Sequence, residues 1–181
     1  MPSIGMVEFN SIARGIEAAD FMLKAAQVDL VTCSTVCPGK YLVLVSGDVA
    51  AVQSSVQVGI ARGDEFVVDD FILPSVHSSV FPAINCTSWV AALQALGIIE
   101  TFSVAAAIVA ADAAVKAAEV ELIEVRTGMG IGGKSFVTLT GDVAAVKAAV
   151  EAGSATARQK GLLVAQAVIP SPAGKLKTAI I

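Results

Sequence analysis

Cys37 lies in a segment where a thiol could bind a metal. The segment Thr35-Val36-Cys37-Pro38-Gly39-Lys40 separates two apolar runs, residues 30–33 and 41–45. Adjacent Pro and Gly favour a tight chain reversal, so the segment is predicted to form the tip of a β-hairpin. A side chain on such a tip points away from the core, and thiolates are the usual ligands of iron–sulfur clusters. A lone cysteine is more often a plain surface thiol, so these residues alone leave both roles open.

The other two cysteines are weaker candidates. Cys33 falls in the predicted strand 28–33, where we expect it to pack in the core, and pairing with Cys37 is a minor alternative. Cys86 lies in a predicted linker with no second ligand near it in the sequence. The odd number of cysteines and the absence of a basic, apolar leader before Glu8 lead us to expect a reducing cytosol without disulfides.

A second loop matches the phosphate-binding pattern G-x-x-x-x-G-K-[ST], from Gly128 to Ser135. The chemistry of that pattern needs a helix directly after the lysine, because the helix N-terminus faces the phosphates. Residues 136–140 are rich in β-branched side chains and precede Gly-Asp, so they are predicted to form a strand. We therefore expect a loop of small residues with accessible backbone amides, and no nucleotide site.

No other constellation favours catalysis. His77 is the only histidine, and no carboxylate or second histidine is placed to make it a base or a zinc ligand. Glu8 and Glu100 recur at the ends of predicted first strands, which indicates a structural role. Because no acid–base pair, nucleophile elbow or zinc spacing occurs, the sequence gives no case for an enzyme.

The sequence contains an internal repeat that positions both loops. Gly5-Met-Val-Glu8 matches Gly97-Ile-Ile-Glu100, and the same offset carries Asp20 onto Asp112 and Lys24 onto Lys116. Past the tip the offset grows by two residues, so that the helix start Gly-Asp-Val-Ala-Ala-Val at residues 47–52 recurs at 141–146. A length change confined to a loop is typical of a duplicated domain. We expect domains at residues 1–92 and 93–181.

Each copy is predicted to have the order β-α-β-β-α-β. The first copy has strands at 3–10, 28–33, 41–46 and 66–73, with one helix from Ser11 and another from Asp48 to about Ala61. In the second copy, the strand at 162–169 is the last element of the unit. The first helix is expected to bury Ile12, Ile16, Ala19 and Leu23, with Val104, Ile108, Ala111 and Val115 at the matched places. The hairpin strands are almost wholly apolar, which predicts that both their faces are covered. The result is an α/β (α+β) fold of two tandem ferredoxin-like units, with a short helix and linker at 75–95 and a weakly ordered tail after Pro172.

Composition limits the possible partners. The 181-residue chain is 55% hydrophobic, yet no apolar run approaches the roughly 20 residues of a membrane span. The net charge is −4 and no basic stripe occurs, which argues against nucleic acid as a partner. The excess of Ala, Val and Ile suits close helix packing and large subunit interfaces.

These repeated motifs resemble those of tandem-domain shell proteins of bacterial microcompartments. The motifs are Gly5-x-x-Glu8-x-x-Ser11, Ala19-Asp20-x-x-x-Lys24, the Gly-Lys after each tip and the Gly-Asp-Val-Ala-Ala-Val helix starts, and they cover nearly the whole chain in unpermuted order. The resemblance implies a homotrimer that forms a flat pseudohexameric tile in a cytoplasmic shell, edge to edge with other shell proteins. It places Lys24 and Lys116 at the tile edge and implies that the hairpin tips ring a central pore lined by Thr35, Val36, Pro38, Gly39, Gly128, Met129, Gly130, Ile131 and Gly132.

Residues 35–40 also resemble the loop of a trimeric, propanediol-utilisation subtype in which the loop cysteine binds an iron–sulfur cluster. The resemblance implies that three copies of Cys37 hold a [4Fe-4S] cluster at the pore, with one iron left open. Electrons could then cross the shell to an encapsulated or cytosolic redox enzyme. The alternatives are a metal-free, gated metabolite pore and, in another class, a soluble small-molecule sensor. Ser171 and Ser75 stand where single-domain members carry an edge-docking arginine, which argues against that contact here.

Overall fold

The computed structural model describes residues 2–128 and 130–180, which form two compact units. The first comprises residues up to Val76 together with residues 130–133 of the second loop, and the second comprises the rest. No helix within the described residues is long and apolar enough to cross a membrane.

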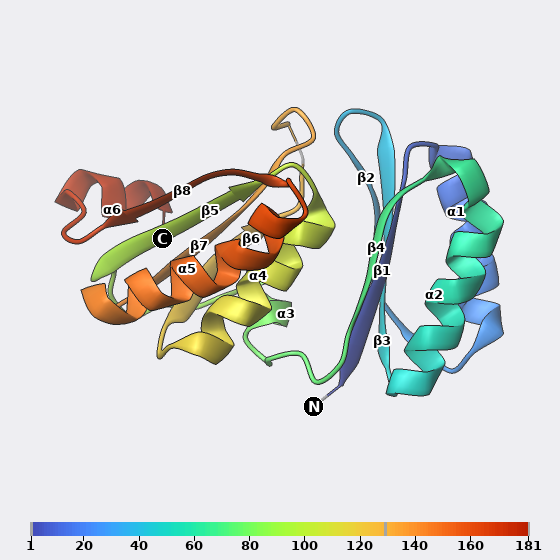
Figure 1. Cartoon of the computed structure of the whole chain (residues 1–181), viewed down its shortest axis with the longest axis horizontal. Coiled ribbons are helices and arrows are strands. Elements are labelled where there is room, and N and C mark those ends of the chain that lie inside the picture. The colour runs from blue at the N-terminus through green and yellow to red at the C-terminus, as the bar shows by residue number, and fades with distance from the viewer. Residues whose placement is uncertain (1, 129, 181) are drawn as a thin grey trace. The chain divides into compact units, whose positions relative to one another are not determined.

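The first unit is a four-stranded antiparallel sheet with two helices on one face (Figure 1). The strand order is β2-β3-β1-β4. Its elements are β1 (Ser3–Phe9), α1 (Ile12–Ala25), β2 (Asp29–Val36), β3 (Lys40–Gly47), α2 (Val49–Gly63), a 3-10 turn η1 (Asp64–Phe66) and β4 (Val67–Leu73).

The second unit repeats this plan with the order β6-β7-β5-β8. Its elements are α3 (Val80–Ile84), β5 (Ala95–Thr101), α4 (Val104–Ala117), β6 (Glu121–Arg126), β7 (Ser135–Gly141), α5 (Val143–Gln159), β8 (Leu163–Ile169) and α6 (Gly174–Ile180). The predicted pair of unpermuted β-α-β-β-α-β units is confirmed. The tail predicted to be weakly ordered instead forms α6, because Ile180 packs against the core cluster around Leu93 and Leu96.

Matched residues in the two repeats start their helices in the same way. The hydroxyls of Ser11 and Ser103 accept the backbone N–H groups of Arg14 and Ala106, at 3.4 and 2.9 Å, which caps α1 and α4. Asp48 and Asp142 occupy the corresponding position before α2 and α5, but their side chains make no capping hydrogen bond.

The repeated glycines of the first strands let a helix lie close to each sheet. A Cβ at Gly5 would be 2.5 Å from Val56 Cγ2 in α2, and a Cβ at Gly97 would be 2.7 Å from Val150 Cγ2 in α5. Only a residue without a side chain fits at these two places.

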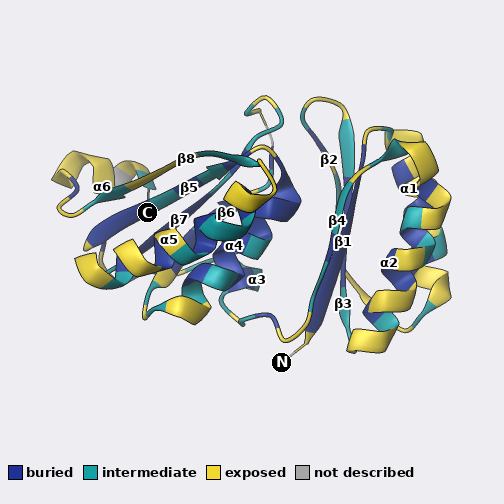
Figure 2. Cartoon of the chain, viewed as in Figure 1, coloured by how far each residue is buried: buried dark blue, intermediate teal, exposed yellow. Residues whose placement is uncertain are grey.

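The predicted buried face of the first helix is wrong for α1. Helix α1 has both buried and exposed parts (Figure 2). Ile12, Ile16 and Leu23 are exposed, and among the four expected residues only Ala19 is buried. The face that packs on the sheet instead carries Gly15, Ala18, Ala19 and Met22, because a Cβ at Gly15 would already lie 2.6 Å from Tyr41. In the matched α4, however, Val104, Ile108 and Ala111 are buried as expected and Val115 is half-buried.

The two hairpin strands also differ in burial. Residues Leu42–Val45 of β3 are fully buried, as their apolar run predicts. The prediction fails for β2, which is the edge strand of its sheet and exposes Leu30.

Candidate functional site

The predicted hairpin tip is present and is short. Strand β2 ends at Val36 and β3 begins at Lys40, and these two residues face each other in the ladder. The turn therefore consists of Cys37, Pro38 and Gly39, where Gly39 has a φ of 82° that favours glycine. Cys37 is a half-buried free thiol, whereas Thr35 and Val36 belong to β2 and not to a loop.

Part of the glycine loop lies against this tip. The backbone N–H of Gly130 donates to Cys37 Sγ at 3.3 Å, and a Cβ at Gly133 would lie 2.9 Å from Pro38 Cδ. These residues belong to the same compact unit as the tip. Hydrogen bonds to a ligating sulfur are one of the means by which proteins tune iron–sulfur clusters. Of the predicted pore-lining residues, Met129 lies outside those the structure describes.

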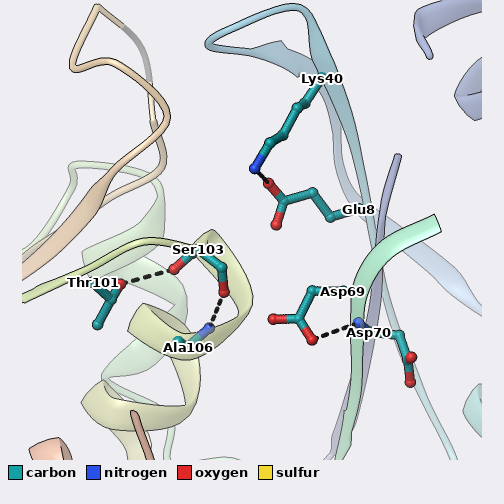
Figure 3. A network of polar contacts seen from close by, with 7 residues as sticks. All are labelled: Glu8, Lys40, Asp69, Asp70, Thr101, Ser103 and Ala106. Atoms are coloured by element: carbon teal, nitrogen blue, oxygen red, sulfur yellow. Dashed lines mark hydrogen bonds and ion pairs between the residues drawn. The ribbon is translucent and has the colours of Figure 1, made fainter. Parts of the chain in front are cut away.

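A buried ion pair holds the base of the Cys37 turn. Lys40 Nζ lies 2.9 Å from Glu8 Oε1, and the two side chains are 18% and 1% exposed (Figure 3). The second repeat carries the same pair, with 2.8 Å between Lys134 Nζ and Glu100 Oε1, but there the side chains are 42% and 32% exposed. In the sequence, Glu8 and Lys40 each recur in the second repeat, as Glu100 and Lys134. The recurrence of two residues of opposite charge is the signal that could have predicted the contact.

The phosphate-loop pattern does not adopt the structure that its chemistry needs. Strand β7 begins at Ser135, directly after Lys134, so a strand stands where the pattern requires a helix. Lys134 instead pairs with Glu100. The strand predicted at 136–140 is thereby confirmed.

Cys33 does not lie fully in the core as expected but is half-buried and packs against the core cluster of the first unit. Its Sγ is 2.9 Å from Tyr41 Oη. The hydrogen bond with Cys33, and then burial, raise the pKa of Tyr41 to about 12. The thiol is thus engaged with a neighbour inside the hairpin and is not directed at the tip.

Cys86 is exposed and lies beside β6. Its Sγ donates to Glu124 Oε1 at 3.7 Å, and Glu124 also pairs with Arg126. Burial, followed by the negative charge of Glu124, raises the pKa of the Cys86 thiol. This environment disfavours the thiolate that a metal requires.

Both predicted edge lysines pair with an aspartate one turn earlier in their helix. Lys24 Nζ is 2.6 Å from Asp20 and Lys116 Nζ is 2.5 Å from Asp112, which accounts for the recurrence of all four residues. Asp112 also accepts the backbone N–H of His77 at 2.8 Å. The role of the two lysines at a tile edge stays a prediction.

One chain does not supply a metal site by itself. Among the described residues, no group of three or more His, Cys, Asp or Glu side chains could hold a metal ion. A cluster at Cys37 would therefore need the same thiol from other copies of the chain.

Comparison with known proteins identifies the family. The model of the BMC domain matches residues 3–76 and again 95–172. The chain is 49% identical to the bacterial microcompartment shell protein PduT of Citrobacter freundii, over 94% of this chain and 92% of that protein. It is also 49% identical to the shell protein EutM of Salmonella typhimurium, over 47% of this chain and 86% of EutM. A crystal structure of a microcompartment protein from Desulfitobacterium hafniense has 62% identity, a TM-score of 0.92, and coverage of 98% of this chain and 99% of that one. The chain therefore belongs to the shell proteins of bacterial microcompartments, with two BMC domains in tandem.

Proposed function

We propose that the chain forms a homotrimeric, pseudohexameric shell tile whose three Cys37 thiols hold a [4Fe-4S] cluster at the central pore. The observation that carries the proposal is the position of Cys37, one thiol per chain on a three-residue turn. The resemblance of residues 35–40 to a cluster-binding loop supports it, as does the high identity to PduT.

The unequal burial of the two first helices supports a homotrimer. Ile12, Ile16 and Leu23 form an exposed apolar stripe on α1, which we call the α1 stripe. Their counterparts on α4, Val104 and Ile108, are buried within the chain. Matched stripes that differ in this way are expected of a subunit in a closed ring, where a second copy covers the exposed one.

The donors near Cys37 suit an iron–sulfur cluster better than a single metal ion. A cubane cluster takes about four ligands, mostly thiolates, and three copies would provide three. The Gly130 N–H would stabilise negative charge on the Cys37 sulfur, while the turn itself orients the thiol. When bound, the cluster would supply one-electron transfer across the shell, to an encapsulated or cytosolic redox enzyme.

The second candidate is a metal-free, gated metabolite pore. It is favoured by the glycine loop, where Gly130 and Gly132 have positive φ and a Cβ on either would meet no other atom within 4 Å. Such a loop presents backbone amides without bulk. In both candidates Lys24 and Lys116 are proposed to meet neighbouring tiles. The names of the relatives, which are shell proteins, favour a shell tile over the sensor alternative.

The test is the iron and acid-labile sulfide content per trimer after anaerobic purification or reconstitution. We expect about one cluster per trimer in the wild type, in Cys33→Ala and in Cys86→Ala. Cys37→Ser should lose the iron and keep the trimer, because the turn is not part of the core. Absence of iron from the reconstituted wild type, or equal iron in Cys37→Ser, would replace the cluster with the metal-free pore.

A further inference from the structure

The Glu8–Lys40 ion pair lies at the one point where the Cys37 turn joins an inner strand. Lys40 is the first residue of β3, immediately after the turn, and Glu8 lies on β1, which is paired with β3 on one side and β4 on the other. On its other side the turn continues into β2, an edge strand with partly exposed residues. The ion pair therefore links the exit of the turn to β1, an inner strand of the sheet.

The burial of Glu8 makes this contact specific. Oε1 is bonded to Lys40, while Oε2 is buried and has no hydrogen-bond partner among the residues the structure describes. Buried carboxylate oxygens normally have partners, so within the described residues the hydrogen bond from Lys40 to Oε1 is the contact that fixes this side chain. The carboxylate is almost fully shielded from water, and the Lys40 ammonium is the cation with which it pairs.

The second repeat offers a natural comparison. Glu100 and Lys134 make the same ion pair in a more exposed setting, where solvent weakens it, and the loop that they hold is two residues longer and has no thiol. The more buried version of the pair is thus found in the repeat that carries the cysteine.

We propose that the Glu8–Lys40 pair is a positioning device for Cys37, which holds the thiol where three copies can converge on one cluster. Ligand groups must lie within about 0.5 Å of their working positions, and a short turn fixed at its base meets that need. The part that concerns the cluster rests on the proposed function, but the fixing of the turn does not.

The experiment compares two matched double variants, Glu8→Leu with Lys40→Met and Glu100→Leu with Lys134→Met. Changing both partners avoids leaving one charge buried and unpaired, which would destabilise the whole unit. Circular dichroism and thermal unfolding would establish that each variant is folded. Lys40→Arg, which keeps the positive charge and hydrogen-bond donors toward Glu8, is the conservative variant for rescue.

The first readout uses the metal-free protein. Hydrogen exchange over residues 34–41 and the alkylation rate of Cys37 should both rise several-fold in the Glu8/Lys40 variant. They should stay near wild type in the Glu100/Lys134 variant and in Lys40→Arg. Unchanged exchange and alkylation in a folded Glu8/Lys40 variant would overturn the proposal, as would an equal rise in the Glu100/Lys134 variant.

The second readout is iron retained per trimer after anaerobic reconstitution. We expect the Glu8/Lys40 variant to retain several-fold less than wild type, and the Glu100/Lys134 variant to match wild type. A loosened turn with undiminished iron would refute the link to the cluster. Wild type without any iron would overturn the proposed function alone, because the first readout would still decide whether the pair positions Cys37.

Discussion

The α1 stripe provides the most direct test of assembly. We expect simultaneous replacement of Ile12, Ile16 and Leu23 by serine to weaken the trimer. The three residues are 40%, 53% and 38% exposed in the single chain, so together they offer the surface of about 1.3 residues. At about 2 kcal/mol for each buried apolar side chain, covering this surface is worth about 2.5 kcal/mol per interface. That loss corresponds to a rise of roughly 10²-fold in the dissociation constant of each interface.

Sedimentation measured across a range of protein concentrations would report this change. The variant should dissociate at concentrations where wild type is still trimeric, with an unchanged circular dichroism spectrum, because the stripe is not part of the core of its own unit. Glu17→Ser is the matched control, since Glu17 is an exposed residue of the same helix that pairs with Arg14. A triple variant that sediments like wild type at every concentration would refute the assignment of the stripe, and a monomeric wild type at micromolar concentration would refute the trimer.

Two further predictions concern stability and ionisation. Gly5→Ala and Gly97→Ala should each lower the free energy of unfolding by about 1–3 kcal/mol in urea titrations, since their Cβ atoms would meet Val56 and Val150, whereas Gly174→Ala, which meets no atom within 4 Å, should be nearly neutral. Equal effects of Gly5→Ala and Gly174→Ala would contradict the close packing of α2. Tyr41 is the only tyrosine, so the ultraviolet absorbance of its phenolate should titrate with a pKa of about 12 in wild type and a lower one in Cys33→Ala. The pKa of Tyr41 in the folded protein lies above the unfolded value of about 10, so the hydrogen bond with Cys33 should stabilise wild type over Cys33→Ala fully below pH 10. The difference in free energy of unfolding between the two proteins should vanish as the pH rises through 12. A difference that stays constant with pH would contradict this role of the hydrogen bond.

The order of elements could be predicted from the sequence because its determinants are local. Local signals mark the elements: serines before α1 and α4, the apolar hairpin runs, and the Gly-Asp pairs at the junctions of β3 with α2 and of β7 with α5. The duplication gave each strand and helix of the β-α-β-β-α-β unit a second instance in the same sequence. Even so, the predicted strand at 28–33 stopped three residues short of the true end of β2, since Ser34 and Thr35 are polar and lie on an edge strand.

The buried face of α1 could not be predicted from residue size. Ranking by hydrophobicity selects Ile12, Ile16 and Leu23, but the sheet approaches the helix so closely that Gly15 and Ala18 must face it. The stripe of large apolar residues lies beside the stripe of small ones, and in the proposed trimer a second copy of the chain covers the large residues. The sequence shows both stripes, and only the distances in the structure distinguish their roles.

The site was predicted in part. The turn that carries Cys37 follows from Pro38 and Gly39, whose conformational preferences are local. The hydrogen bond from Gly130 to Cys37 joins residues 93 positions apart in the sequence. Neither a glycine nor a cysteine indicates by its residue type which distant residue it will contact. The burial of Glu8 depends on all the residues packed around the end of β1. The repeat therefore indicates that Glu8 pairs with Lys40, but it does not indicate how deeply the pair is buried.

Because the domain is duplicated within one chain, the two tips can carry different residues, and this has a chemical consequence for the proposed tile. In a ring built from six identical domains, every tip would carry the same residues, so a thiol at one tip would mean six around the pore. Six thiolates exceed the roughly four ligands that a cubane cluster accepts, and the surplus would lie close together as like charges. A tandem chain can keep the cysteine in one repeat, on a short turn with a buried anchor, and place glycines in the other. The number of thiols then matches what a cluster with one open iron requires, and the glycine loop is free to supply the backbone N–H that contacts the sulfur.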